Sequence, residues 1–151
     1  MVNTMELNLD KRYQTLVVLW FALLMSIGMY FLFSLFVAPG TSNEPGNPRS
    51  LLLTVTLTAL GTFLVILSFA VKQKLLERSV EKQDVSLVQK ALVIACAMCE
   101  VSALLGLLEH FIVGSREYYP LFLVAAAGTA FHFPRRSHLE AASYKNPTQL
   151  S

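Results

Sequence analysis

The chain has 151 residues, 54% of them hydrophobic and 15% charged, with a formal net charge of +2. Soluble domains carry about 25% charged residues, so this composition indicates a protein whose main solvent is lipid. The apolar segments use more than half of the chain and exclude a separate soluble domain.

Four apolar segments predict transmembrane helices, because a span needs roughly 17 to 25 mostly apolar residues. We expect helices at about 14–38, 51–80, 86–113 and 118–133, followed by a polar C-terminal tail at 135–151. The first segment is expected to be a retained anchor, because its apolar run is longer than the roughly 7 to 15 residues of a signal sequence. The fourth is short and ends at Arg135 and Arg136.

The basic residues indicate the orientation in the membrane. In a four-span arrangement, ten of the 12 basic residues fall on one side, in the N-terminal tail, the middle loop with its flank and the C-terminal tail; Arg49 and Arg116 fall on the other. Basic residues in short loops stay cytoplasmic. The sequence therefore predicts an all-α fold: one membrane domain over 1–151, a four-transmembrane-helix bundle of two antiparallel hairpins, with both termini cytoplasmic in the inner (cytoplasmic) membrane.

Short polar side chains recur at helical spacing inside the expected spans. Ser26 lies in the first span, and Thr54, Thr58 and Thr62 follow one another at four-residue intervals in the second. Small and weakly polar residues favour contacts between membrane helices. Alternatively, each hydroxyl bonds the carbonyl four residues before it. Between the second and third helices, Asp84 or Ser86 is expected to cap the third helix.

Glu100 is the strongest candidate for chemistry. The third span has its midpoint near residue 102, which places Glu100 roughly 3 Å from the bilayer centre. A charged carboxylate there costs about 2.5 to 3.5 kcal/mol, so we expect it to be protonated, paired or facing a cavity. Two interpretations remain open: an ion- or proton-binding site formed with Thr58, Thr62 and Ser26, or a neutral structural carboxyl bonded to one of these hydroxyls.

Residues 58–114 resemble the helical hairpin of the rotor proteolipid, subunit c, of F- and V-type ATP synthases. The resemblance consists of a helix with small residues, a polar loop, and a second helix with the stretch ALVIACAMCEVSALLGLLEHF. It implies that Glu100 corresponds to the ion-binding carboxylate of that family, and Gly106 to a later glycine. The chain departs from the family in having only Gly61 in the second helix and in lacking the Arg-Gln-Pro loop signature.

Two further motifs have alternative interpretations. Glu109 and His110 form a possible proton relay or a ligand to a metal or porphyrin, or else an interfacial pair that touches water. Cys96 and Cys99 form a C-x-x-C pair, which suggests redox chemistry, but as the two cysteines of the chain inside an apolar segment they fit small packing residues better.

These features predict a non-enzyme without a catalytic residue or a metal site, and they indicate no particular cofactor. The expected function is that of a structural or accessory subunit of a larger membrane complex, and the expected type of complex is an energy-transducing one. The alternative is a proton- or ion-translocating proteolipid-like protein that uses Glu100. The expected partners are the lipid bilayer and other membrane subunits or further copies of the chain, and not nucleic acid.

Overall fold

The computed structural model describes residues 4–38, 48–114 and 118–143, and these residues form five helices and no strand. In chain order the helices are α1 (Thr4–Phe36), α2 (Pro48–Glu81), α3 (Val85–Val113), α4 (Tyr119–Phe131) and α5 (Arg136–Ser143). The all-α prediction is therefore confirmed.

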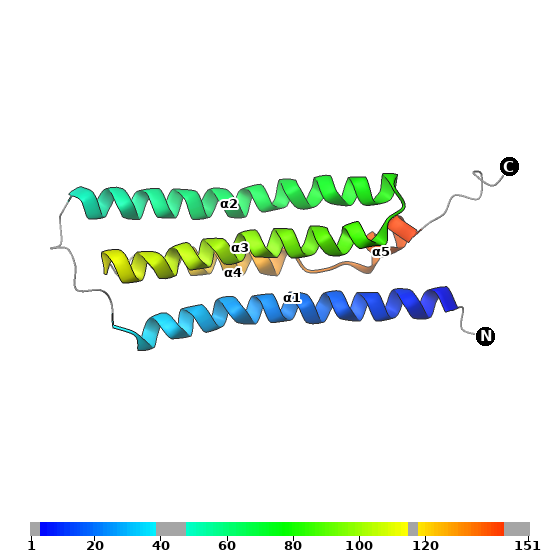
Figure 1. Ribbon diagram of the computed structural model, residues 1–151, viewed down its shortest axis with the longest axis horizontal. Coiled ribbons are helices and arrows are strands. Elements are labelled where there is room, and N and C mark those ends of the chain that lie inside the picture. Colours follow the sequence, from blue (N-terminus) through cyan, green and yellow to red (C-terminus); the bar gives the residue numbers. More distant parts are fainter. Residues whose placement is uncertain (1–3, 39–47, 115–117, 144–151) are drawn as a thin grey trace.

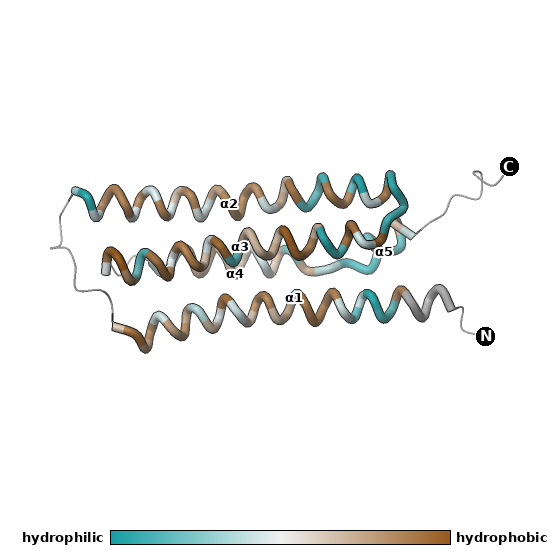
Figure 2. Tube along the Cα trace, in the orientation of Figure 1, coloured by the Kyte–Doolittle hydropathy of each residue, from teal (hydrophilic) through white to brown (hydrophobic). Residues whose placement is uncertain are grey.

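Three helices are long and apolar enough to cross a membrane. They are Leu9–Phe36 within α1, the whole of α2 and the whole of α3. Apolar residues fill the middle of each helix, and polar residues gather at the end where α2 and α3 are joined (Figure 2). Many large apolar side chains in these helices are exposed, among them Phe21, Met29 and Ile66. Such a surface suits contact with lipid.

The helix α4 is shorter than α1, α2 and α3. It has 13 residues, which gives a length of about 20 Å, whereas the hydrocarbon core of a bilayer is about 30 Å thick. The following chain, from His132 to Arg135, is not helical and runs beside α3 toward α5 (Figure 1). Pro134 explains this end, because a proline disfavours helical backbone in the residue before it.

The bounds of two segments differ from the expected ones. The first helix begins at Thr4 and not near residue 14, because residues 4–13 contain neither proline nor glycine and continue the helix into the polar region. The expected polar tail at 135–151 contains α5, whose Leu139 and Ala142 are buried. These two residues are three positions apart and therefore share one face of a helix.

The helix α3 lies at the centre of the molecule. It packs against α1, α2, α4 and α5, while α1 and α2 have no contact with each other in the part of the chain that the structure describes (Figure 1). The first expected hairpin is therefore not a packed pair of helices. The reason lies in α3, which buries small residues on several sides, including Ala91, Ala95, Ser102 and Gly106.

Both ends of α3 have defined caps. The Asp84 carboxylate accepts a hydrogen bond from the Ser86 backbone N–H at 2.8 Å, so Asp84 and not Ser86 is the N-cap. Hydrogen bonds from the Ser86 side chain and backbone hold the pKa of the Asp84 carboxyl below its usual range. At the other end, Gly114 adopts φ 65°, the left-handed conformation that commonly ends a helix.

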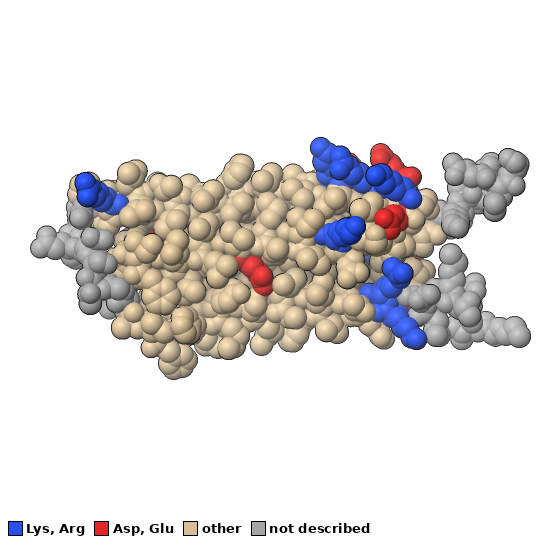
Figure 3. Space-filling model, viewed as in Figure 1, with Lys and Arg blue, Asp and Glu red and all other residues tan. Residues whose placement is uncertain are grey.

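Basic side chains gather at one end of the molecule. In Figure 3 they cluster where α2 and α3 are joined, and the middle of the same face shows no basic side chain but does show an acidic one. Arg49 lies at the beginning of α2, at the opposite end. Arg116 and Lys145 lie outside the described residues.

Candidate functional site

Glu100 lies on α3 and faces α1. The Ser26 hydroxyl makes a hydrogen bond with the Glu100 carboxyl, and Ser26 Oγ also lies 2.8 Å from the Leu23 carbonyl. A serine hydroxyl has one proton to donate. The Leu23 carbonyl and the Glu100 carboxyl therefore share one hydroxyl as their donor.

Thr58 and Thr62 do not share this site. With Thr54 they line a groove of about 860 Å³ between α2 and α4, and Glu100 is not part of its wall. The opposite wall is formed by Tyr119, Pro120 and Leu123 of α4. The structure therefore brings Ser26 to Glu100 and places the threonines at a second site.

The hydroxyl groups in this groove are available for bonding. No hydrogen bond to any of the described residues is made by Thr54, Thr58 or Thr62. Thr54 is 8% exposed. Thr56, on the exposed side of α2, behaves differently and donates to the Leu52 carbonyl at 2.7 Å. On α2, the usual bond from a threonine hydroxyl to the carbonyl of the preceding turn is thus made by Thr56 outside the groove, but not by the threonines inside it.

Glu109 and His110 are both buried within the molecule. Glu109 is 0% exposed, and His110 is 5% exposed. His110 Nε2 lies 3.1 Å from the Val37 carbonyl, and its ring lies 4.5 Å from the Tyr118 ring. Adjacent residues on a helix do not face each other. The two side chains therefore point in different directions from α3 and do not form one site by themselves.

A buried polar cluster at the end of α4 was not predicted. His132, which is fully buried, places Nε2 2.8 Å from Ser68 Oγ, and Cys99 Sγ lies 3.7 Å from the same oxygen. Ser68 Oγ is also 2.6 Å from the Val65 carbonyl. When Ser68 donates there, His132 Nε2–H is the donor to Ser68. The signal in the sequence was a histidine at the end of an apolar segment, which by itself does not reveal burial.

The last carbonyls of α4 are bonded to side chains from other helices. Trp20 Nε1 donates to the Thr129 carbonyl at 2.7 Å, and Lys72 Nζ donates to the His132 carbonyl at 3.2 Å. The ends of helices leave carbonyls without intrahelical partners. Here α1 and α2 supply the donors, which allows α4 to end within the bundle.

The two cysteines are buried and reduced. Cys99 lies against α4, where Gly128 leaves room for its sulfur. No group of three or more His, Cys, Asp or Glu side chains is placed to hold a metal ion within the described ranges.

The fold therefore defines a class, a helical protein with three helices that could cross a membrane. No family model, no curated protein and no solved structure matches the chain.

Proposed function

We propose that this chain is a small polytopic membrane protein that acts as a structural or accessory subunit of a larger membrane complex. The groove between α2 and α4 is the docking site for a transmembrane helix of a partner chain. The row of unbonded threonine hydroxyls at Thr54, Thr58 and Thr62 is the observation that supports this proposal.

The spacing of the three threonines fits a helical partner. They lie four residues apart on α2 and extend along about 12 Å of its axis. A helix lying in the groove offers serine, threonine or small residues at the same spacing and meets each hydroxyl in turn. Hydrogen bonds between membrane helices contribute about 0.6 kcal/mol each on average, and at most about 1.7 kcal/mol.

Lipid does not supply what these hydroxyls lack. The hydrocarbon core contains no hydrogen-bond acceptor, and an unbonded polar group there is costly. A partner helix satisfies the hydroxyls and covers the apolar residues of the groove, such as Phe63 and Leu123. The large exposed apolar surface of α1 and α2 offers further area for such contacts.

The proposal includes a topology. The basic end of the molecule faces the cytoplasm of an inner-membrane-type bilayer, which places both termini there. The helix α4 and the non-helical residues after it cross together as the fourth span, with α5 at the cytoplasmic surface.

The groove is tested by removing its hydroxyl groups while keeping their volume. In the triple variant Thr54→Val, Thr58→Val, Thr62→Val we expect a co-purifying chain to be retained about 20-fold less, because three bonds of about 0.6 kcal/mol are lost. The measurement is gentle detergent extraction of the tagged full chain, followed by a native gel and mass spectrometry.

Thr56→Val is the matched control, since Thr56 lies on the exposed side of the same helix and bonds its own helix. It should retain the partner at the wild-type level. A wild-type chain that runs alone in mild detergent, or equal losses in the control and the triple variant, would contradict the proposal.

A second candidate function is supported by the contact between Glu100 and Ser26. A protonatable carboxyl bonded to a hydroxyl at mid-membrane depth is suited to bind and release a proton or a small cation. In this alternative the chain is a proteolipid-like translocating protein that assembles with itself.

Labelling with a hydrophobic carbodiimide distinguishes this alternative. Wild-type protein should be labelled at Glu100, with labelling blocked by sodium or by high pH, and Glu100→Gln should reduce it at least tenfold because the reactive carboxyl is gone. Glu140→Gln, which removes an exposed acid of α5, serves as the control. If Glu100→Gln leaves folding, assembly and transport unchanged, the translocation hypothesis fails.

A further inference from the structure

Three cationic or potentially cationic residues lie around the segment that leads from α4 into α5, to which Lys72 is bonded through the His132 carbonyl. They are Lys72 of α2, Arg135 of the connecting chain and His138 of the first turn of α5. Burial and the positive charges of Lys72 and Arg135 lower the pKa of His138. The charge of Arg135 also acts on Lys72. Each member of this basic cluster is therefore within electrostatic reach of another.

The connecting chain holds the cluster in place. Lys72 Nζ donates to the His132 carbonyl at 3.2 Å, which fixes the lysine beside the segment that leads to Arg135. The His138 backbone N–H donates to the Arg135 backbone carbonyl at 3.2 Å in the first turn of α5. An ammonium group has three donors, so Lys72 keeps two N–H groups for another acceptor.

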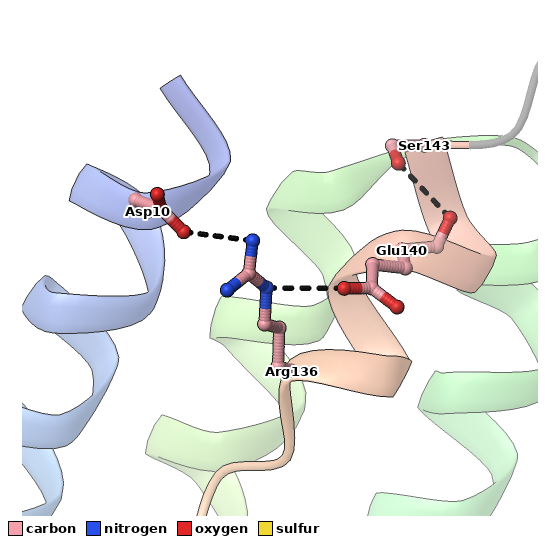
Figure 4. A network of polar contacts seen from close by, with 4 residues as sticks. All are labelled: Asp10, Arg136, Glu140 and Ser143. Carbon is pink, nitrogen blue, oxygen red and sulfur yellow. Dashed lines mark hydrogen bonds and ion pairs between the residues drawn. The ribbon is translucent and has the colours of Figure 1, made fainter. Parts of the chain in front are cut away.

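No acid balances this cluster among the residues whose side chains are described. Neither Lys72 nor Arg135 forms an ion pair there, and no carboxylate is among the charges that act on Lys72 or His138. The neighbouring Arg136 differs: it lies 3.0 Å from both Asp10 and Glu140 (Figure 4). Asp10 and Glu140 thus neutralise Arg136, whereas Arg135 forms no ion pair with a described residue.

The cluster lies at the depth where lipid headgroups are expected. Lys72 directly follows the apolar part of α2, and α5 continues from Arg135 at the basic end of the molecule. The charges of partly buried Lys72 and exposed Arg135 have the same sign and repel each other. An anion between them relieves this repulsion, and a phosphate oxygen accepts bonds from a guanidinium in a forked geometry.

We propose that Lys72, Arg135 and His138 bind the phosphate of one anionic phospholipid at the cytoplasmic surface. Lys72 and Arg135 supply the charge, and the imidazole of His138 supplies a further N–H donor. The inference relies on the proposed membrane location but not on the groove between α2 and α4, since none of the three residues lines that groove.

The test uses the full chain in neutral detergent with added phosphatidylglycerol, and native mass spectrometry measures the lipid-bound fraction. Arg135→Gln should weaken retention of one lipid roughly fivefold, because one basic residue at an anionic surface contributes about that much to binding. Arg135 is exposed and its side chain makes no hydrogen bond to a described residue, so the variant should fold normally. Lys72→Gln should reproduce the loss.

Arg78→Gln is the control, because it removes one charge from the exposed side of α2 at the same end of the molecule. It should bind phosphatidylglycerol like the wild type, and zwitterionic phosphatidylcholine should be retained less than phosphatidylglycerol. Equal losses for Arg78→Gln and Arg135→Gln would overturn the site in favour of diffuse attraction. If inorganic phosphate saturates the site at the concentrations that displace the lipid from it, the assignment to a lipid is overturned.

Discussion

Leu139→Ala should release α5 from the rest of the molecule, with a loss of about 2 to 5 kcal/mol in the free energy of docking. Leu139 is 1% exposed and lies in a cluster of buried residues with Leu16, Val88 and Leu92. This cluster is at the basic end, where the alternative to burial is contact with water. The hydrophobic effect therefore acts on Leu139 at full strength, and the truncation also leaves a cavity.

An eight-residue helix has little stability of its own. Ion pairs do not compensate for the lost burial of Leu139. The side chains of Arg136, Asp10 and Glu140 are more than half exposed, and such exposed pairs contribute about 0 to 1 kcal/mol. Hydrogen exchange in detergent micelles should show the α5 amides exchanging at least roughly 30-fold faster in the variant.

Leu123→Ala provides a matched control for this prediction. Leu123 is 70% exposed on α4, so its truncation creates no cavity. The α5 amides should exchange in this variant as they do in the wild type. Unchanged protection of α5 in Leu139→Ala would show that this residue does not anchor the helix.

Gly128→Ala should destabilise the packing of α4 by about 1 to 3 kcal/mol. A Cβ at Gly128 would lie 2.7 Å from Val65 Cγ1, closer than real contacts allow, and 3.0 Å from Cys99 Sγ, which is tighter than most real contacts. Valine has a stiff, branched side chain and cannot rotate away easily. The added methyl therefore forces α4 away from α2 and α3.

The consequence is large because lipid gives helices no hydrophobic reason to associate. Contact between α4 and its neighbours depends on close approach of their backbones, and separation weakens many dispersion contacts together. It also disturbs the bond between His132 and Ser68, which lies one turn farther along. Titration of the folded protein in mild detergent with a denaturing detergent, followed by Trp20 fluorescence, should give an earlier midpoint for Gly128→Ala.

Gly28→Ala is the control, since nothing lies within 4 Å of a Cβ placed at Gly28. This glycine lines a separate apolar groove of about 400 Å³ between α1 and α4. Its substitution should leave the midpoint unchanged or raise it slightly, because alanine is the better helix former. An identical decrease in both variants would show that the effect comes from helix propensity and not from packing at Gly128.

The sequence predicted the long helices well because their signals are local. An apolar run of span length, an acid before Ser86 and a glycine at residue 114 each act through residues nearby in the chain. The helices α2 and α3 end within a few residues of the expected positions for this reason. The start of α1 at Thr4 was missed because polar residues continue a helix as readily as apolar ones when no proline or glycine intervenes.

The candidate site shows where local signals are insufficient. Ser26, Thr58 and Thr62 were all expected near Glu100, because each is a hydroxyl residue within an apolar span. Only Ser26 meets Glu100, since α1 packs on one side of α3 and the threonines turn toward α4. Spacing along a helix identifies residues that share a face but not the neighbour that the face meets.

The sequence by itself therefore determined that the chain is helical and that basic residues gather at one end; of the four expected spans, three are helices long and apolar enough to cross a membrane. Only the tertiary structure decided that α4 ends within the bundle, that α5 docks through Leu139, and that His132 is buried beside Ser68. Helix formation and hydropathy depend on neighbouring residues in the chain. The end of α4 and the two polar sites depend on donors and cavities supplied by helices far away in the sequence, as Trp20 and Lys72 supply the bonds for the last carbonyls of α4.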